Sequence, residues 1–392
     1  MGFHSPLSRT IAGLGGFVLA LFVTELALRQ LVPAPAEYGL EAKLSYLAEA
    51  GGDFDTIFIG SSRVAYGVDA VAFDEHMAEL GAPTRSFNMG VGGMTTVEAN
   101  QVLSRVLALE LPALRTVVLE FGAWDGRIYD RKNALSNRSI GWHTPGNTWQ
   151  ALVALGNTPL PRRQEHPLTW RLGDFVTHFD ALARNLFCVG AGPRTVAGLV
   201  ASEPAWRRDK WLTVADLEER RGFQDLSAID DEFRVRGHEE FLKRPGKFTR
   251  RVAHIPAQIR AQVPLADHHN LQALAAQIGR IEAAGLRPIY FTPPGKLGQP
   301  LGRCLHAAGR LPAYLAFDDP ERYPELYALE SRNDAVHLNG LGAALFAEYL
   351  AREFMALPPS SNGSGAALDS VPAAASRANG SKASDAGPES GN

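Results

Sequence analysis

The sequence predicts an α/β fold in which helices cover both faces of a mostly parallel sheet, a three-layer α/β/α sandwich. Short apolar runs typical of buried strands alternate along the chain with amphipathic segments of helical length. This order implies parallel strands joined by right-handed crossovers. The alternation stops after about residue 126 and resumes near residue 267. We therefore expect one domain over residues 38–357, with an insertion, or cap, at about 127–265.

Five strands are predicted from runs of β-branched, aliphatic and aromatic residues that end in glycine, proline or polar residues. The clearest run is Thr-Val-Val-Leu-Glu-Phe within 114–121, which stops at Gly122. The run at 56–59 reads Thr-Ile-Phe-Ile and stops at Gly60. The other three predicted strands are 85–89, 287–291 and 314–317.

Helices are predicted where apolar residues recur every three or four positions. Three of these segments are followed by a glycine that can end a helix, namely Gly51, Gly81 and Gly285. The predicted helices are 38–50, 68–80, 96–109, 268–284 and 341–355, with a short one after residue 295.

The insertion is rich in Arg, Trp and Pro and contains short amphipathic pieces without a run of strands. It could line a substrate cleft, or it could serve as a partner surface or as padding. Scattered His and Trp residues are more often packed or exposed than functional. The candidates for a cleft wall are Trp142, His143, Trp149, His166, Trp170 and His178.

Both ends of the chain differ from the domain. From Thr10 to Leu28 the sequence is almost wholly apolar, and about 19 residues at 1.5 Å each are just enough to cross a bilayer. We expect residues 1–37 to form an uncleaved anchor and a linker, since a signal peptide has a shorter apolar core, although Ala34-Pro-Ala36 leaves cleavage open. Residues 358–392 are rich in Ala, Ser, Gly, Asn and Pro and are predicted to be disordered.

Composition excludes several functions. The 392 residues carry a formal net charge of -3, which gives no electrostatic reason to expect nucleic-acid binding. No glycine-rich loop followed by Lys-Ser or Lys-Thr is present, so nucleotide chemistry is not expected. Cys188 and Cys304 have no metal-ligand spacing and form either one disulfide or two thiols. We expect neither a metal nor a cofactor.

Three short segments carry residues suited to acyl chemistry. The first predicted strand ends in Gly60-Ser61-Ser62, at the edge of the sheet where α/β proteins place ligands. Either serine could instead only cap the next helix. Serine needs a nearby base to become a nucleophile, and Asp334-Ala-Val-His337 offers a histidine and a carboxylate to orient it.

These segments resemble the SGNH (GDSL-like) hydrolases, which have a flavodoxin-like three-layer fold. They resemble in particular the membrane-anchored bacterial branch, which includes alginate-type O-acetyltransferases and the D-alanyl-transfer proteins of cell-wall modification. The matching segments lie within about residues 53–126 and 266–355. The blocks that carry the resemblance are Phe58-Ile-Gly60-Ser61-Ser62-Arg63, Asn88-Met-Gly90-Val-Gly92-Gly93-Met-Thr95 and Asp334-Ala-Val-His337.

The resemblance implies a catalytic triad in which Ser62 is the nucleophile, His337 the base and Asp334 its orienting carboxylate. It also implies that the backbone N–H groups of Ser62 and Gly93 form an oxyanion hole. Arg63 and Asp125 are candidates to contact the substrate, and a structural salt bridge is the alternative for Arg63.

One block departs from the family pattern. The family carries Gly-x-Asn-Asp after the third strand, where the asparagine donates to the oxyanion. This chain has Gly122-Ala-Trp124-Asp125 there. Losing one oxyanion donor typically costs about 2.7–4 kcal/mol of transition-state stabilisation. Asn88 and the indole N–H of Trp124 are the candidate replacements.

The implied function is that of a membrane-tethered, serine-dependent acyl-ester enzyme, an O-acetyltransferase or an esterase. Its expected substrate is an extracytoplasmic polysaccharide or another envelope glycan. The implied location is the inner membrane, crossed once, with the domain facing the periplasm or cell exterior. A membrane-bound O-acyltransferase is a candidate partner. The alternative is a degenerate, non-catalytic protein that binds a glycan or an acyltransferase.

Overall fold

The structure is a computed structural model that describes residues 6–31, 39–122, 124–128, 131–158, 167–187, 212–229, 231–263, 265 and 271–358. Five strands form one sheet in the order β2-β1-β3-β4-β5, and every neighbouring pair is parallel. The predicted α/β class and parallel sheet are confirmed. The strands are β1 (Thr56–Ile59), β2 (Ser86–Asn88), β3 (Thr116–Glu120), β4 (Arg287–Thr292) and β5 (Tyr314–Ala316).

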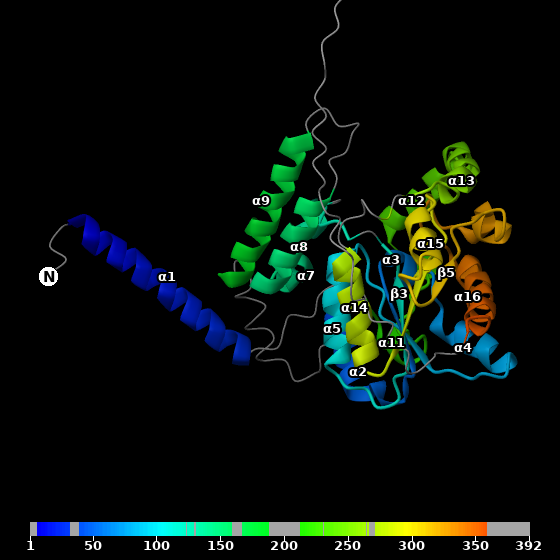
Figure 1. The fold of residues 1–392 in the computed structure, drawn as a ribbon, viewed down its shortest axis with the longest axis horizontal. Coiled ribbons are helices and arrows are strands. Elements are labelled where there is room, and N and C mark those ends of the chain that lie inside the picture. The colour runs from blue at the N-terminus through cyan, green and yellow to red at the C-terminus, as the bar shows by residue number, and fades with distance from the viewer. Residues whose placement is uncertain are drawn as a thin grey trace, which may run out of the picture. The chain divides into compact units, whose positions relative to one another are not determined.

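Helices of two groups accompany the sheet (Figure 1). Those of the α/β frame, which we define as residues 39–122 and 271–358, are α2 (Leu40–Ala50), α3 (Ser62–Ala65), α4 (Ala70–Glu79), α5 (Thr96–Leu107), α14 (Leu271–Ala283), α15 (Pro300–Ala307) and α16 (Gly340–Met355). Those of the middle segment, residues 124–263, are α6 (Arg131–Ala134), α7 (Asn137–Trp142), α8 (Pro145–Asn157), α9 (Pro167–Leu186), α11 (Val214–Glu218), α12 (Glu232–Lys243) and α13 (Gly246–Ile259). Short 3-10 turns are η1 (Gly51–Asp53), η3 (Leu226–Ala228), η4 (Pro324–Tyr327) and η5 (Leu329–Ser331).

Successive residues of a strand point to opposite sides of the sheet. Because the strands consist almost wholly of apolar residues, both faces of the sheet are apolar. Ile57 and Ile59 of β1 pack in one core cluster with residues of α2, α5 and α14. Phe58 packs in the other cluster, with residues of α4, α13 and α16. Figure 1 shows α5 and α14 on one side of the sheet and α4 and α16 on the other. This is the three-layer arrangement that near-continuous apolar strands require.

Two helices begin at other residues than predicted, because a side-chain cap determines their first residue. The segment predicted as 68–80 begins as α4 only at Ala70, because the Asp69 side chain accepts hydrogen bonds from the amides of Val71 and Ala72. The closing helix α16 begins at Gly340, because the Asn339 side chain accepts from Gly342 N. Such caps satisfy backbone donors that a helix leaves open at its first turn.

The described residues of the middle segment form helices joined by loops and contribute no strand to the described sheet. Helices α7 and α8 both pack against α9, and α8 also contacts α5 of the frame. The short amphipathic pieces predicted for this region are therefore found as a helical layer attached to the frame.

The structure describes only part of the two ends of the chain. Helix α1 (Pro6–Leu31) covers the predicted anchor, and some of its apolar side chains, including Leu14 and Phe17, are more than 60% exposed. Among the residues that the structure describes, no helix has the length and apolar character needed to cross a bilayer. The transmembrane helix therefore stays a prediction. The predicted linker at 32–37 lies outside the described residues, and so does the predicted tail at 358–392 apart from residue 358.

Candidate active site

The site lies where the order of the strands reverses. The chain passes from β1 to β2 on one side and then returns to place β3 on the other side of β1. In parallel sheets, ligands bind at the carboxyl ends of the strands beside such a switch point. The loops that leave β1 at Gly60 and β3 at Phe121 both begin there. The predicted Gly-Ser-Ser turn is thus at the edge of the sheet that most often holds a site.

Ser62, His337 and Asp334 are brought together although 275 positions separate the serine from the histidine. His337 Nε2 lies 2.8 Å from Ser62 Oγ, and His337 Nδ1 lies 2.8 Å from Asp334 Oδ2. The contact between Ser62 and His337 connects the turn after β1 with the loop before α16. A serine, a base and an orienting carboxylate within hydrogen-bond reach make the arrangement used for nucleophilic catalysis.

The carboxylate fixes the direction of these hydrogen bonds. An ionised carboxylate only accepts, so Nδ1 of His337 donates to Asp334 and Nε2 of the neutral ring accepts from the Ser62 hydroxyl. Asp334 Oδ1 also accepts from the amides of Val336, at 2.6 Å, and His337, at 2.9 Å. Burial alone would raise the pKa of Asp334, but the His337 side chain and the two amides together lower it to about 2. The carboxylate is therefore ionised at neutral pH.

A buried arginine supports the loop that carries the histidine. Arg332 is fully buried, its Nε donates to Asp334 O at 3.4 Å, and its guanidinium lies over the rings of Phe248 and Tyr327. Burial lowers the pKa of Arg332 to about 10. The sequence did not point to this residue, because only the folded loop shows that the side chain turns inward.

Ser61 and Ser62 have different roles, as the structure shows. Ser61 is the N-cap of α3: its Oγ accepts from Arg63 N at 3.3 Å and donates to Glu120 Oε1 at 3.0 Å. Its amide donates to Glu120 Oε2 at 2.5 Å. The cap interpretation thus holds for Ser61, whereas Ser62 follows as the first helical residue and faces His337.

Glu120, the last residue of β3, organises this turn, and sequence reasoning missed it. It accepts from Arg63 Nε at 2.9 Å and from Arg63 Nη2 at 2.5 Å, and only 8% of its side chain is exposed. The structure therefore shows Arg63 in a salt bridge, the alternative to the predicted substrate contact. A glutamate at the end of an otherwise apolar strand was the available signal.

The predicted further oxyanion donors are engaged elsewhere. Asn88 is fully buried, and its Nδ2 donates to the carbonyls of Val64, at 2.8 Å, and Val68, at 2.7 Å. An amide nitrogen has two hydrogens, so neither is left for an oxyanion. This corrects the suggestion that Asn88 could donate. Trp124 is 7% exposed and packs in the core cluster of the α5 side.

Gly93 occupies a turn that only glycine adopts easily, with φ +71°. A Cβ there would lie 2.8 Å from Asn133 Nδ2, which donates to Gly93 O at 2.9 Å. Arg138 Nη1 donates to the neighbouring Gly92 O at 2.6 Å. The middle segment thus holds the loop on which the predicted oxyanion glycine lies.

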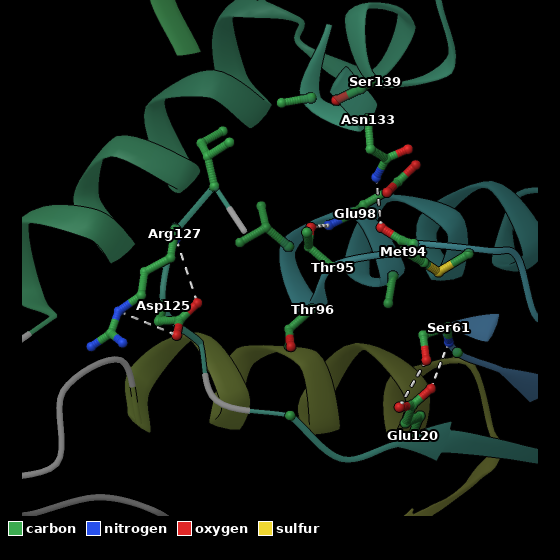
Figure 2. A pocket seen from close by; sticks show the side chains of 18 of the residues that line it. Ser61, Met94, Thr95, Thr96, Glu98, Glu120, Asp125, Arg127, Asn133 and Ser139 are labelled. Atoms are coloured by element: carbon green, nitrogen blue, oxygen red, sulfur yellow. Dashed lines mark hydrogen bonds and ion pairs between the residues drawn. The ribbon is translucent and has the colours of Figure 1, made fainter. Parts of the chain in front are cut away.

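A cavity of about 810 Å³ lies beside the triad. Figure 2 shows side chains of its wall. Ser61, Arg63 and Val336, the neighbours of Ser62 and His337, line it, but Ser62 and His337 themselves do not. The predicted contact Asp125 is on the wall, with its Oδ2 3.6 Å from Arg127 Nε. The frame and the middle segment both contribute to this wall, so the triad lies at the border of the cavity rather than at its centre.

A buried ion pair joins the two regions at the cavity. Arg138 Nε lies 2.8 Å from Glu98 Oε1, and the two side chains are 3% and 2% exposed. These two atoms are close but not aligned as a hydrogen bond, whereas Arg138 Nη2 donates to Glu98 Oε2 at 3.3 Å. Burial raises the pKa of Glu98, and the Arg138 guanidinium opposes that rise.

Three of the predicted cleft-wall residues form one cluster. His143 Nε2 lies 2.9 Å from His178 Nδ1, and the Trp142 ring stacks on His143 with centroids 3.9 Å apart. His178 Nε2 reaches Gly126 O at 2.8 Å, and Trp142 and His178 line the cavity. Burial lowers the pKa of His143 to about 4. Trp149 is exposed, and His166 lies outside the described residues.

Ser62, His337 and Asp334 have the geometry that nucleophilic catalysis by a serine requires, and a cavity lies beside them. Within the described residues, no group of His, Cys, Asp and Glu side chains is arranged to hold a metal ion. Cys304 is a free thiol, and Cys188 lies outside the described residues. A scan against models of protein families found no match to this chain, and a search of curated proteins found no relative.

Proposed function

We propose that this protein is an SGNH-type, serine-dependent acyl-ester enzyme, tethered to the inner membrane, that transfers or hydrolyses O-acyl groups of an extracytoplasmic polysaccharide. The observation that carries the proposal is the chain of two 2.8 Å hydrogen bonds from Ser62 through His337 to Asp334. It lies at the sheet edge that the strand order marks as a ligand site.

The proposed reaction begins when Ser62 Oγ attacks the ester carbonyl and His337 Nε2 takes the hydroxyl proton. The imidazolium that forms is stabilised by Asp334, which is ionised at neutral pH. Collapse of the tetrahedral intermediate breaks the ester bond, and His337 returns the proton to the departing alkoxide. An acyl-serine remains. Water or a sugar hydroxyl then attacks it, with His337 again as the base.

Backbone N–H groups are the proposed oxyanion donors. Ser62 and Gly93 are the two that the family resemblance nominates, and Asn88 is excluded by its bonds to Val64 O and Val68 O. Preorganised donors are worth most where water is excluded. Asn133 and Arg138 hold the carbonyls of Gly93 and Gly92, so they preorganise this loop without contacting the reacting atoms.

The cavity supports a glycan as the second substrate. Its volume of about 810 Å³ is within the range of roughly 300–1,000 Å³ typical of small-molecule sites. Asp125, Arg127 and Asn133 on its wall supply acceptors and donors suited to hydroxyl groups. A site that holds a sugar hydroxyl near the acyl-serine would favour transfer over hydrolysis, because orientation raises the effective concentration of the acceptor.

The anchor and the partner complete the proposal. The apolar stretch from Thr10 to Leu28 is the proposed single membrane span, and a membrane-bound O-acyltransferase is the proposed source of acyl groups. A compartment-sensitive reporter fused after Asn392 tests the topology. Activity of an extracytoplasmic reporter supports the proposed location, and a cytoplasmic signal contradicts it.

Activity tests the chemistry. We expect turnover of p-nitrophenyl acetate, and release or transfer of acetate from at least one member of a panel of acetylated glycans. Both activities should be lost in Ser62→Ala. A folded wild-type protein that acts on neither substrate but binds a glycan from the panel would support the non-catalytic alternative. The departure at Trp124 is the observation that favours that alternative.

A further inference from the structure

Helix α9 is amphipathic in the opposite sense to a normal surface helix. Large apolar side chains recur along its solvent side at intervals of three or four residues, with Phe187 immediately after the helix. Between 43% and 70% of each is exposed. We call this set the α9 face; its members are Leu168, Leu172, Val176, Phe179 and Phe187. A surface helix normally turns such a stripe toward the core.

The side of α9 that packs on the protein is mainly polar. Its residues are at most 8% exposed and comprise Asp174, Thr177, His178, Ala181 and Asn185. At 100° per residue this set lies on the side of the helix opposite the α9 face. The polar side chains bind the neighbouring backbone: Asp174 accepts from Ile128 N at 3.3 Å, and Asn185 donates to Ile140 O at 2.8 Å. These bonds fix which side of the helix faces outward.

Charges on α9 are tied to local partners. Arg171 donates to Thr158 O, and Arg184 Nε pairs with Asp180 Oδ1 at 2.9 Å. Among the exposed described positions of the helix, only Thr169 carries a hydrogen-bonding side chain. The neighbouring helix α8, which runs beside α9 in Figure 1, also has exposed apolar side chains, Trp149 and Val153.

This chemistry favours lipid over a protein as the occupant. Protein interfaces carry about one hydrogen bond per 100–200 Å² and a polar rim. The α9 face offers almost no side chain for such bonds, whereas the acyl boundary of a bilayer requires none. Helices that lie in the membrane interface bury Leu, Phe and Trp on one side to a depth of roughly 5–10 Å.

The chain also keeps a bilayer within reach, a step that rests on the proposed anchoring. Helix α1 ends at Leu31 and α2 begins at Leu40. The intervening residues, 32–39, can extend over roughly 30 Å at most. A membrane that holds α1 therefore lies close to the domain, and the high local concentration of lipid favours even a modest apolar contact.

We propose that the α9 face docks on the lipid bilayer, with α9 lying in the membrane interface parallel to its surface. Docking then gives the domain one orientation relative to the bilayer. His178, on the opposite side of α9, is part of the cavity wall, so docking holds the cavity close to the membrane. An acyl donor delivered at the bilayer would reach it over a short path.

Depth-dependent quenching tests the docking in the full chain. The protein is reconstituted in vesicles of phosphatidylethanolamine and phosphatidylglycerol, with Cys188→Ser and Cys304→Ser removing the native thiols. An NBD fluorophore is attached to a single cysteine introduced by Val176→Cys, Leu341→Cys or Phe17→Cys. Leu341 is a matched control on α16, 56% exposed, and Phe17 reports on α1.

We expect doxyl lipids with a shallow label to quench the probe at 176 by about twofold or more and to leave the probe at 341 unchanged. Phe17 is near the middle of the proposed span, so doxyl lipids labelled deep in the acyl chain are used for the probe at 17. Adding Leu172→Glu should reduce the quenching at 176. Quenching at 17 without quenching at 176 overturns the docking while the anchor stands. Quenching at neither position overturns both, and the turnover of p-nitrophenyl acetate reports on the chemistry separately. If quenching at 176 is absent, disulfide-linked dimers of the unlabelled Val176→Cys protein would show that a second copy covers the face.

Discussion

The α/β frame and the middle segment build the site in different ways. The frame supplies all three triad residues, and they lie on turns that hydrogen bonds fix at both ends, such as the Ser61 cap and the two amides on Asp334. The middle segment supplies no triad residue, but it holds the Gly92–Gly93 loop and closes the cavity. The proposed chemistry thus depends on residues of the frame, and the surroundings of these residues depend on the middle segment.

The largest expected effect comes from removing the triad carboxylate in the frame. In Asp334→Asn the side chain can donate to His337, which favours the wrong tautomer of the ring. We expect kcat for p-nitrophenyl acetate to fall on the order of 10⁴-fold with little change in the fold. Asp125→Asn is the matched control, since it alters a cavity acid outside the triad. Equal losses in both variants would contradict the assigned roles.

Breaking the buried ion pair between the two regions should lower the free energy of unfolding. Arg138→Met leaves Glu98 buried without its partner, and we expect about 3–5 kcal/mol less free energy of unfolding. Urea denaturation measures this. The double variant Glu98→Gln with Arg138→Met should recover most of the loss.

A partly exposed ion pair within the frame gives the control for this comparison. Arg105 and Glu41 form a salt bridge with side chains 38% and 19% exposed. We expect Arg105→Met to cost no more than about 1 kcal/mol. If Arg105→Met and Arg138→Met lower the free energy of unfolding by similar amounts, the burial of the Arg138–Glu98 pair does not increase the cost of breaking it.

The two regions should lose stability in different ranges of pH. His143 has its pKa lowered to about 4, below the ordinary 6.5, so the unfolded chain binds more protons between these values. The middle segment is therefore expected to lose about 3 kcal/mol as pH falls from 6.5 to 4. Asp334, with its pKa lowered to about 2, stabilises the frame above pH 4 and loses that effect as pH falls toward 2.

Chemical denaturation across these ranges of pH checks both assignments. His143→Gln should flatten the dependence between pH 6.5 and 4, and Asp334→Asn should flatten it between pH 4 and 2. If His143→Gln keeps the full slope in the upper range, another group is responsible for it.

The smallest effect is expected at Trp124, where the chain departs from the family pattern. Because the side chain packs in the core, Trp124→Phe should preserve most contacts and change kcat by less than about fivefold. Loss of a true oxyanion donor costs roughly 10²–10³-fold. A loss of that size, with unchanged stability, would identify the indole N–H as a donor.

The frame could be predicted from sequence because local patterns determine it. The apolar runs at Thr56–Ile59 and Thr116–Glu120 need burial on both faces, and that alone specifies strands in a covered sheet. The residues suited to acyl chemistry were visible as motifs. That Ser62 and Asp334 each lie within hydrogen-bond distance of His337 was implied by the family resemblance and not by any local signal.

The supporting contacts could not be predicted in the same way. Glu120 with Ser61, and Arg138 with Glu98, are pairs separated by tens of residues, and no periodicity links their positions. Asn88 was a plausible oxyanion donor from the sequence, but its two side-chain N–H groups donate to the backbone carbonyls of Val64 and Val68. The outward apolar side of α9 was also hidden, because an amphipathic pattern does not say which side faces the core.

The central claim is that Ser62 is an activated nucleophile. A fluorophosphonate probe reacts with such a serine, and peptide mass spectrometry locates the adduct. We predict labelling of wild type at Ser62, labelling of Ser61→Ala at the same site, and no labelling of Ser62→Ala. An adduct on Ser61, or no adduct on folded wild-type protein, would contradict the claim.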